Sequence, residues 1–79
     1  MVLDLSNSEK RKLIIIGERI KTLRKNRTNL SYKKFAELIN MNKNTYYRIE
    51  RGEGDYTIIQ LLRILSYYGI SMEEFFTEL

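Results

Sequence analysis

Apolar residues recur at steps of three and four along most of the chain, and no stretch shows the strict alternation that is typical of a half-buried strand. The pattern therefore predicts an all-α protein. It is clearest in the first third of the chain, where one apolar stripe consists of Leu13, Ile16, Ile20 and Leu23. This stripe predicts a long helix over residues 8–26, with Ser8 as its N-cap and Glu9 in its first turn, where a negative charge complements the helix dipole.

Two features of this first helix go beyond a single buried face. Ile14 and Ile15 widen the apolar stripe, so they either cover the edge of the core or contact a second subunit. Gly17 lies in the helix interior, where glycine costs about 1 kcal/mol relative to alanine. Close packing of another element against Gly17 would offset that cost.

Capping residues and glycines divide the rest of the chain into four shorter helices. The expected N-caps are Ser31, Asn42, Thr57 and Ser71, and the helices that follow them span residues 32–39, 43–51, 58–68 and 72–79. Asn40 tolerates the left-handed conformation that ends a helix, and Gly52 and Gly69 end the two helices before them. The sequence thus predicts one domain over residues 1–79, with five helices and with residues 1–7 flexible.

Residues 31–52 predict a helix-turn-helix, in which the second helix is capped and rich in polar and basic residues. Ala36 supplies the small residue that is needed where the two helices cross. On the second helix, Tyr46 and Ile49 fall on the side that meets the core, and the opposite side carries Lys43, Asn44, Tyr47, Arg48 and Arg51. The adjacent tyrosines are therefore expected to differ, with Tyr46 in the core and Tyr47 as a surface aromatic or a DNA contact.

The net charge of +4 is distributed unevenly. Residues 10–34 contain ten basic residues and one acid, whereas residues 52–79 contain five acids and one base. This asymmetry indicates either a side that faces a polyanion such as nucleic acid or the ordinary charge of solvated helices.

The composition also argues against several functions. The chain has no histidine, no cysteine and no glycine-rich phosphate loop, so we expect neither an enzyme nor a cofactor, metal or small-molecule ligand. Its longest apolar run is far shorter than a membrane span, and no signal peptide is visible, so we expect a cytoplasmic protein without a membrane partner.

Three segments occur in a familiar order and spacing: "IGERIKTLR", "LSYKKFAELINMNKNTYYRIERG" and "LLRILSYYGISMEEFF". Through them, residues 16–76 resemble the lambda-repressor/Cro-like helix-turn-helix family, whose members have a five-helix DNA-binding domain. The resemblance implies a sequence-specific regulator of transcription, a repressor, that binds double-stranded DNA. We also expect a homodimer formed through the C-terminal helices, with helix 43–51 in the major groove.

The resemblance assigns roles to individual residues. The implied base contacts are Lys43, Asn44 and Arg48, followed by Tyr47 and Asn42. The implied phosphate contacts are Tyr32, Arg51, Lys33 and Arg27, of which Lys33 and Arg27 are also explained as solvated charges. Arg24 and Glu50 are implied to form a partly buried ion pair that holds helix 43–51 at its angle.

The chain departs from the family pattern at several positions. Asn40 stands where glycine is usual, Tyr32 replaces a glutamine, and Tyr46 replaces a β-branched residue. The link between the first two helices is one residue longer than usual. The loop over residues 52–56 is acidic because of Glu53 and Asp55, which argues against strong phosphate binding there, although the main-chain amides of Gly52 and Gly54 remain candidates.

The alternative is a protein-interaction module such as an antitoxin, because a fold does not fix a function. The C-terminal part of the chain is acidic and aromatic and contains Tyr67, Tyr68, Phe75, Phe76 and Leu79. These residues either bind a partner protein, or they close the core and form a homodimer interface.

Overall fold

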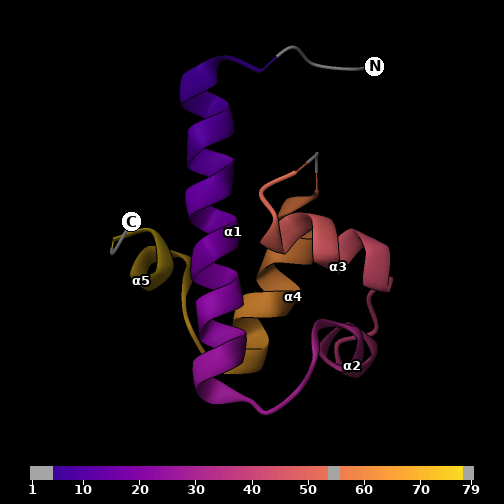
Figure 1. Ribbon diagram of the computed structural model, residues 1–79. Coiled ribbons are helices and arrows are strands. Elements are labelled where there is room, and N and C mark those ends of the chain that lie inside the picture. Colours follow the sequence, from indigo (N-terminus) through magenta and orange to yellow (C-terminus); the bar gives the residue numbers. More distant parts are fainter. Residues whose placement is uncertain (1–4, 54–55, 78–79) are drawn as a thin grey trace.

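A computed structural model of the chain describes residues 5–53 and 56–77 (Figure 1). The regular structure in these two ranges is entirely helical and comprises α1 (Asn7–Arg27), α2 (Tyr32–Leu38), α3 (Lys43–Glu50), α4 (Ile58–Tyr68) and α5 (Met72–Thr77). The all-α fold with five helices that the hydrophobic pattern predicts is confirmed. α2 and α3 each end one residue earlier than predicted, and the last two residues of the final predicted helix lie outside the described ranges.

The start of α1 differs from the prediction. Ser6, not Ser8, is the N-cap: its Oγ accepts a hydrogen bond from the main-chain N–H of Glu9 at 3.1 Å, and the Glu9 carboxylate accepts one from the N–H of Ser6 at 2.9 Å. This reciprocal pair is a capping box. The prediction of Ser8 was wrong because the Glu9 side chain reaches back three residues instead of only complementing the dipole. Asn7 is therefore already helical, and residues 1–4 of the segment expected to be flexible lie outside the described ranges.

The other helix boundaries follow the predicted caps. The side chain of each predicted N-cap accepts a hydrogen bond from a main-chain N–H in the first helical turn, which confirms Ser31, Asn42, Thr57 and Ser71. The residue that turns the chain after α2, α3 and α4 has a positive φ, and these residues are Asn40 (56°), Gly52 (72°) and Gly69 (68°). Asn40 thus takes the left-handed conformation that was predicted for it.

The core lies between the inner faces of the helices and is rich in aromatic rings. Phe35 is at its centre, with its ring centroid 5.1 Å from that of Tyr46 and 5.6 Å from that of Tyr68. Tyr46 has no solvent-exposed surface, which confirms it as the core tyrosine. Because α1 contributes Ile20 and Leu23 from its C-terminal half, the buried part of its apolar stripe begins well inside the helix.

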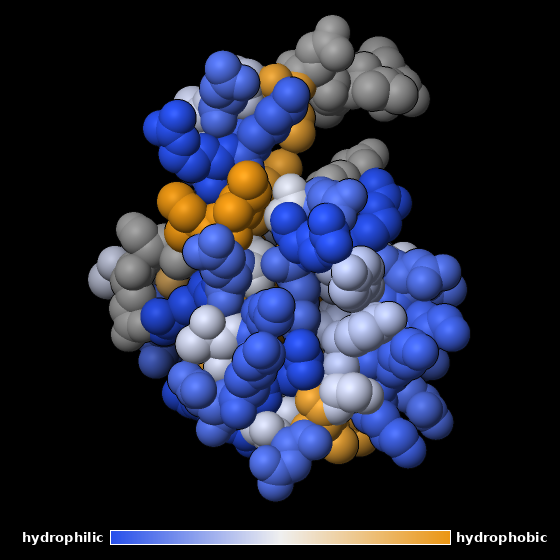
Figure 2. All heavy atoms as spheres, viewed as in Figure 1, coloured by the Kyte–Doolittle hydropathy of each residue, from blue (hydrophilic) through white to orange (hydrophobic). Residues whose placement is uncertain are grey.

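The N-terminal half of α1 leaves apolar side chains at the surface. Ile14 and Ile15 are 46% and 42% exposed, so each is only partly covered, and an apolar patch is visible over this part of α1 (Figure 2). In the described ranges, no helix has the length and apolar character that would be needed to span a membrane.

The backbones of α1 and α3 are in direct contact at Gly17. A β-carbon built at this position would lie 2.5 Å from the carbonyl oxygen of Ile49 and 2.6 Å from that of Glu50. Only a residue without a side chain leaves room for so close a crossing. The expected close packing at Gly17 is therefore confirmed, and it sets the position of α3 against the longest helix.

Candidate nucleic-acid interface

The outer face of α3 is exposed over its whole length. Its side chains from Lys43 to Arg51 divide as predicted: Tyr46, Ile49 and Glu50 are buried, whereas the exposed set comprises Lys43, Asn44, Tyr47, Arg48 and Arg51. α3 lies at the edge of the molecule beside α2, and the surface over that side is predominantly hydrophilic (Figures 1 and 2). A capped helix therefore presents a polar and basic stripe to the solvent.

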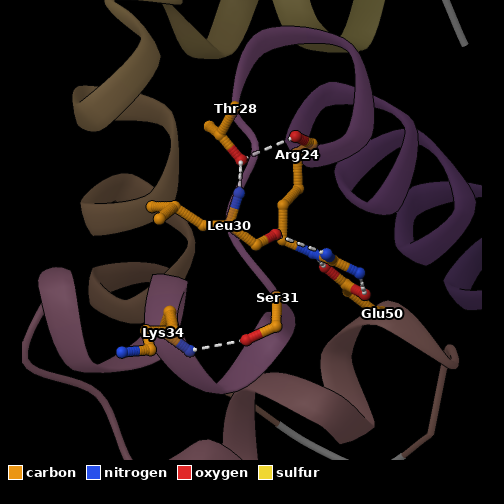
Figure 3. A network of polar contacts seen from close by, with 6 residues as sticks. All are labelled: Arg24, Thr28, Leu30, Ser31, Lys34 and Glu50. Atoms are coloured by element: carbon orange, nitrogen blue, oxygen red, sulfur yellow. Dashed lines mark hydrogen bonds and ion pairs between the residues drawn. The ribbon is translucent and has the colours of Figure 1, made fainter.

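A buried ion pair fixes the inner face of α3 (Figure 3). The Nε and Nη2 atoms of Arg24 donate hydrogen bonds of 2.8 and 3.0 Å to the two carboxylate oxygens of Glu50. Both residues are buried, with 8% and 7% of their surface exposed. The contact is bidentate, which constrains orientation as well as distance. The hydrogen bond to Glu50 raises the pKa of Arg24 above its ordinary value.

The same arginine also fixes the link between α1 and α2. Its Nη1 atom donates a 2.9 Å hydrogen bond to the carbonyl oxygen of Leu30. The hydroxyl of Thr28 donates to the carbonyl oxygen of Arg24 at 2.8 Å and accepts from the N–H of Leu30 at 3.1 Å (Figure 3). α1, the link and α3 therefore form one hydrogen-bonded unit, in which Glu50 has a structural role.

A shallow groove of about 550 Å³ lies where α2 meets the start of α3. It is lined by Lys33, Glu37, Asn40, Met41, Asn42 and Lys43. Asn42 is occupied as the cap of α3, because its Oδ1 atom accepts hydrogen bonds from the N–H groups of Asn44 (2.8 Å) and Thr45 (3.3 Å). Lys33 and Lys43 thus share one groove, while Asn42 has only its amide NH2 group left to offer.

The far end of α3 carries a row of side chains that begins on α2. The ring of Tyr32 lies 4.8 Å from the ring of Tyr47, measured between centroids. The hydroxyl of Tyr47 accepts a 3.0 Å hydrogen bond from Nη1 of Arg51, whose Nε lies 2.6 Å from a carboxylate oxygen of Glu53. The Tyr47 hydroxyl and then the Glu53 carboxylate raise the pKa of Arg51. The structure thus joins three predicted DNA contacts with one acid.

The contact between Arg51 and Glu53 was not anticipated from the sequence. Residues two positions apart do not face each other on a helix. Here Gly52, with its positive φ, reverses the chain between them and brings Glu53 back to the end of α3. An acid directly after a helix-ending glycine is the sequence signal for this contact.

The other predicted phosphate groups lie outside α2 and α3. Arg27 is the last residue of α1 and is exposed, so it stays a predicted phosphate contact. The N–H of Gly52 donates to the carbonyl oxygen of Ile49 at 3.0 Å, so this amide is used within the protein, contrary to the expectation that it was free for phosphate. Gly54 and Asp55, the other residues discussed for this loop, lie outside the described ranges.

A further missed contact supports the turn between α2 and α3. Arg63 of α4 donates a 3.1 Å hydrogen bond through Nη1 to the carbonyl oxygen of Asn40. No group of acidic side chains in the described ranges is arranged to hold a metal ion. Apart from the acids Glu37 and Glu53, the groups gathered on this surface are cationic, amide and phenolic, which are the groups that bind phosphates and base edges.

The geometry is that of a helix-turn-helix regulator, and comparison with known proteins agrees. The chain belongs to the helix-turn-helix family of the Cro/C1 type, whose model matches residues 20–75. It is 33% identical over 66 residues to the control protein C.MunI from Mycoplasma sp, an alignment that covers 84% of this chain and 89% of that protein. No solved structure matches the chain significantly. The protein is thus a DNA-binding regulator of transcription.

Proposed function

We propose that α3 enters the major groove of double-stranded DNA and that Lys43, Asn44 and Arg48 contact base edges there. The observation that carries the proposal is the exposed polar stripe of α3 on a helix fixed from behind by Gly17 and Arg24. Lysine and arginine pair with the acceptors of guanine, and asparagine pairs in a bidentate manner with adenine. The contacts of α3 with Gly17 and Arg24 matter because base contacts depend on the orientation of the helix.

The groups around the stripe suit contacts to the sugar–phosphate backbone. Lys33 shares the groove with Lys43, and Tyr32 and Arg51 flank Tyr47 at the other end. Such contacts position a protein on DNA without reading its sequence. Tyr47, which is 39% exposed, is suited to a thymine methyl group or a phosphate. Asn42 has a lesser role at the bases because its side-chain oxygen Oδ1 caps α3. Arg27 has a lesser role at phosphate.

The regulator acts as a repressor and as a symmetric dimer formed through α4 and α5. Support comes from exposed apolar residues on these helices, namely Leu62, Tyr67 and Phe76, and from the relative that is named a control protein. In such a dimer, two copies of α3 would enter successive major grooves about 34–36 Å apart. Light scattering at high micromolar concentration tests this point, and a monomer both with and without bound DNA would contradict it.

Fluorescence anisotropy with a random-sequence duplex over a salt series tests DNA binding. We expect binding at low salt. The logarithm of the association constant should then fall linearly with the logarithm of the salt concentration. The absence of binding at low salt would contradict the proposal.

Substitutions then test which residues read the sequence. With a preferred duplex, Lys43→Ala and Arg48→Ala should each lose about 1–3 kcal/mol of discrimination against random DNA. Lys10→Ala, at an exposed position in the first turns of α1, is the matched control and should leave discrimination unchanged. An equal loss on preferred and random DNA would show that the two α3 residues contact only phosphate.

A second candidate function is the binding of a partner protein through the same fold. It is favoured by the exposure of Ile58 and Ile59, which are 58% and 63% accessible in the first turn of α4. Apolar groups that gather at a surface often mark protein contacts. Under this alternative the anisotropy experiment gives no binding to any duplex, so the same measurement separates the two functions.

A further inference from the structure

The guanidinium group of Arg51 is already engaged in the free protein. Nε is 2.6 Å from the Glu53 carboxylate, Nη1 donates to the Tyr47 hydroxyl at 3.0 Å, and the guanidinium carbon lies 5.5 Å from the centre of the Tyr47 ring. A phosphate that grips an arginine side-on through two parallel hydrogen bonds needs the Nε–H donor. That donor is the one that Glu53 occupies.

The position of Glu53 is set by the main chain and not by its side chain alone. Its N–H donates a 2.9 Å hydrogen bond to the carbonyl oxygen of Arg48, and the N–H of Gly52 donates to Ile49. These two bonds, together with the positive φ of Gly52, are the Schellman arrangement that ends a helix. The carboxylate is therefore held beside the last turn of α3 without any need for DNA.

Both members of the ion pair are nevertheless accessible. The side chains of Arg51 and Glu53 are 57% and 54% exposed, so the pair is hydrated and screened by salt. A pair of this kind is weak enough for a DNA phosphate to displace the carboxylate. It is also close enough to the exposed stripe of α3 for the exchange to occur when the helix approaches DNA.

We propose that Glu53 is an internal competitor of DNA for Arg51: its carboxylate occupies the place on the guanidinium group that a backbone phosphate takes in the complex. This inference rests on the proposed function, because it requires that α3 faces DNA. Glu53 then lowers the affinity for all duplexes alike, since phosphate contacts carry no sequence information. Tyr47, braced against the ring of Tyr32, holds Nη1 while Nε changes partner.

A double-mutant cycle tests whether Glu53 acts through Arg51 or by general repulsion of DNA. The variants are Glu53→Gln, Arg51→Gln and the two combined, each titrated with the same preferred duplex and random duplex at one salt concentration. Glu53→Gln should raise the affinity for both duplexes by the same factor, up to about fivefold, which is the range of an exposed ion pair. In the Arg51→Gln background the same change should have no effect.

Glu37→Gln is the matched control, because Glu37 is an exposed acid on α2 that lines the groove with Lys33 and Lys43. Any gain from removing its charge should persist unchanged in the Arg51→Gln background. If the gain from Glu53→Gln also persists there, Glu53 acts by general repulsion and the proposal is overturned. No gain from Glu53→Gln on either duplex overturns it as well.

A measurement without DNA separates this proposal from the proposed function. Hydrogen exchange of the Arg51 Nε–H, followed by nitrogen-15 NMR, should be slower in the wild-type protein than in Glu53→Gln. Equal exchange rates overturn the competitor role even if the protein binds DNA. The exchange could instead be slowed while no variant binds any duplex at low salt. The ion pair would then exist, but it would not compete with DNA. That result overturns both the competitor role and the proposed function.

Discussion

Replacement of Gly17 by alanine would test how the close contact between α1 and α3 fixes the position of α3. The new β-carbon would lie 2.5, 2.6 and 2.9 Å from the Ile49 carbonyl oxygen, the Glu50 carbonyl oxygen and the Glu50 carbonyl carbon. All three are main-chain atoms of a helix, so no side-chain rotation relieves the overlap. Ordinary contact begins at about 3.4 Å, and the two helices must therefore move apart by about 0.9 Å.

Two opposing effects decide the change in stability. Alanine favours the helical state over glycine by about 1 kcal/mol. Overpacking typically costs about 1–3 kcal/mol, and rigid main-chain neighbours place Gly17→Ala in the upper part of that range. We therefore expect the free energy of unfolding to fall by about 1–2 kcal/mol. For a domain of this size, each kcal/mol lowers Tm by about 4–8 °C.

Movement of α3 should also weaken DNA binding, because it lengthens the 2.8 and 3.0 Å contacts between Arg24 and Glu50 that orient the helix. Circular dichroism during urea and thermal unfolding measures stability, and anisotropy with a preferred duplex measures binding. Gly69→Ala is the matched control. It places alanine at a φ of 68°, and apart from Gly69 itself and its two chain neighbours, no atom of the described residues lies within 4 Å of the β-carbon.

The control should lose about 1–2 kcal/mol of stability through its left-handed backbone, yet bind DNA with unchanged affinity under conditions in which it is folded. The reasoning fails if Gly17→Ala stabilises the protein by about 1 kcal/mol, as at a solvent-exposed helical site. It fails equally if both variants bind the preferred duplex as the wild type does.

Two further predictions concern the interior. Arg24→Met should lower the free energy of unfolding by about 3–5 kcal/mol because it leaves the Glu50 carboxylate buried without its partner. In urea denaturation, the double variant Arg24→Met and Glu50→Met should lose less stability than Arg24→Met alone. A loss in the double variant equal to the sum of the two single losses would contradict this. Burial, and then the nearby Glu50 carboxylate, raises the pKa of Tyr46. Its contribution to stability is therefore complete below the unfolded pKa of about 10 and is lost as the pH rises above it, by up to about 1.36 kcal/mol per pH unit. Unfolding measured from pH 8 to 11 should show a shallower decline for Tyr46→Phe, and an unchanged decline would refute the assignment.

Local patterns were sufficient to predict most of the fold. The caps Ser31, Asn42, Thr57 and Ser71 were predictable because a cap depends only on residues within one turn. The start of α1 was not, because Ser6 and Ser8 are both good caps and only the reach of Glu9 decides between them. The burial of Tyr46 and the exposure of Tyr47 followed from helical spacing relative to Ile49.

The candidate site was only partly predictable. The exposed residues of α3 follow from periodicity, but the contacts among them depend on how the chain turns after the helix. The sequence places Arg51 for a phosphate contact, but it does not reveal that the turn at Gly52 brings Glu53 against this arginine. Arg27 and Lys33 look equivalent by charge alone, but Arg27 ends α1, whereas Lys33 lines the groove beside Lys43. Pairings that depend on a reversal of the chain are not contained in a helical pattern.

Selection of bound sequences from a random pool of DNA duplexes tests the central claim most directly, which is that the outer face of α3 reads bases in the major groove. The account predicts enrichment of an inverted repeat whose half-sites lie about one helical turn apart. It further predicts that Arg48→Ala, selected in parallel, loses the preference at one position of each half-site. A selected pool that cannot be distinguished from the input, or an Arg48→Ala variant that selects the wild-type sequence, would contradict the claim.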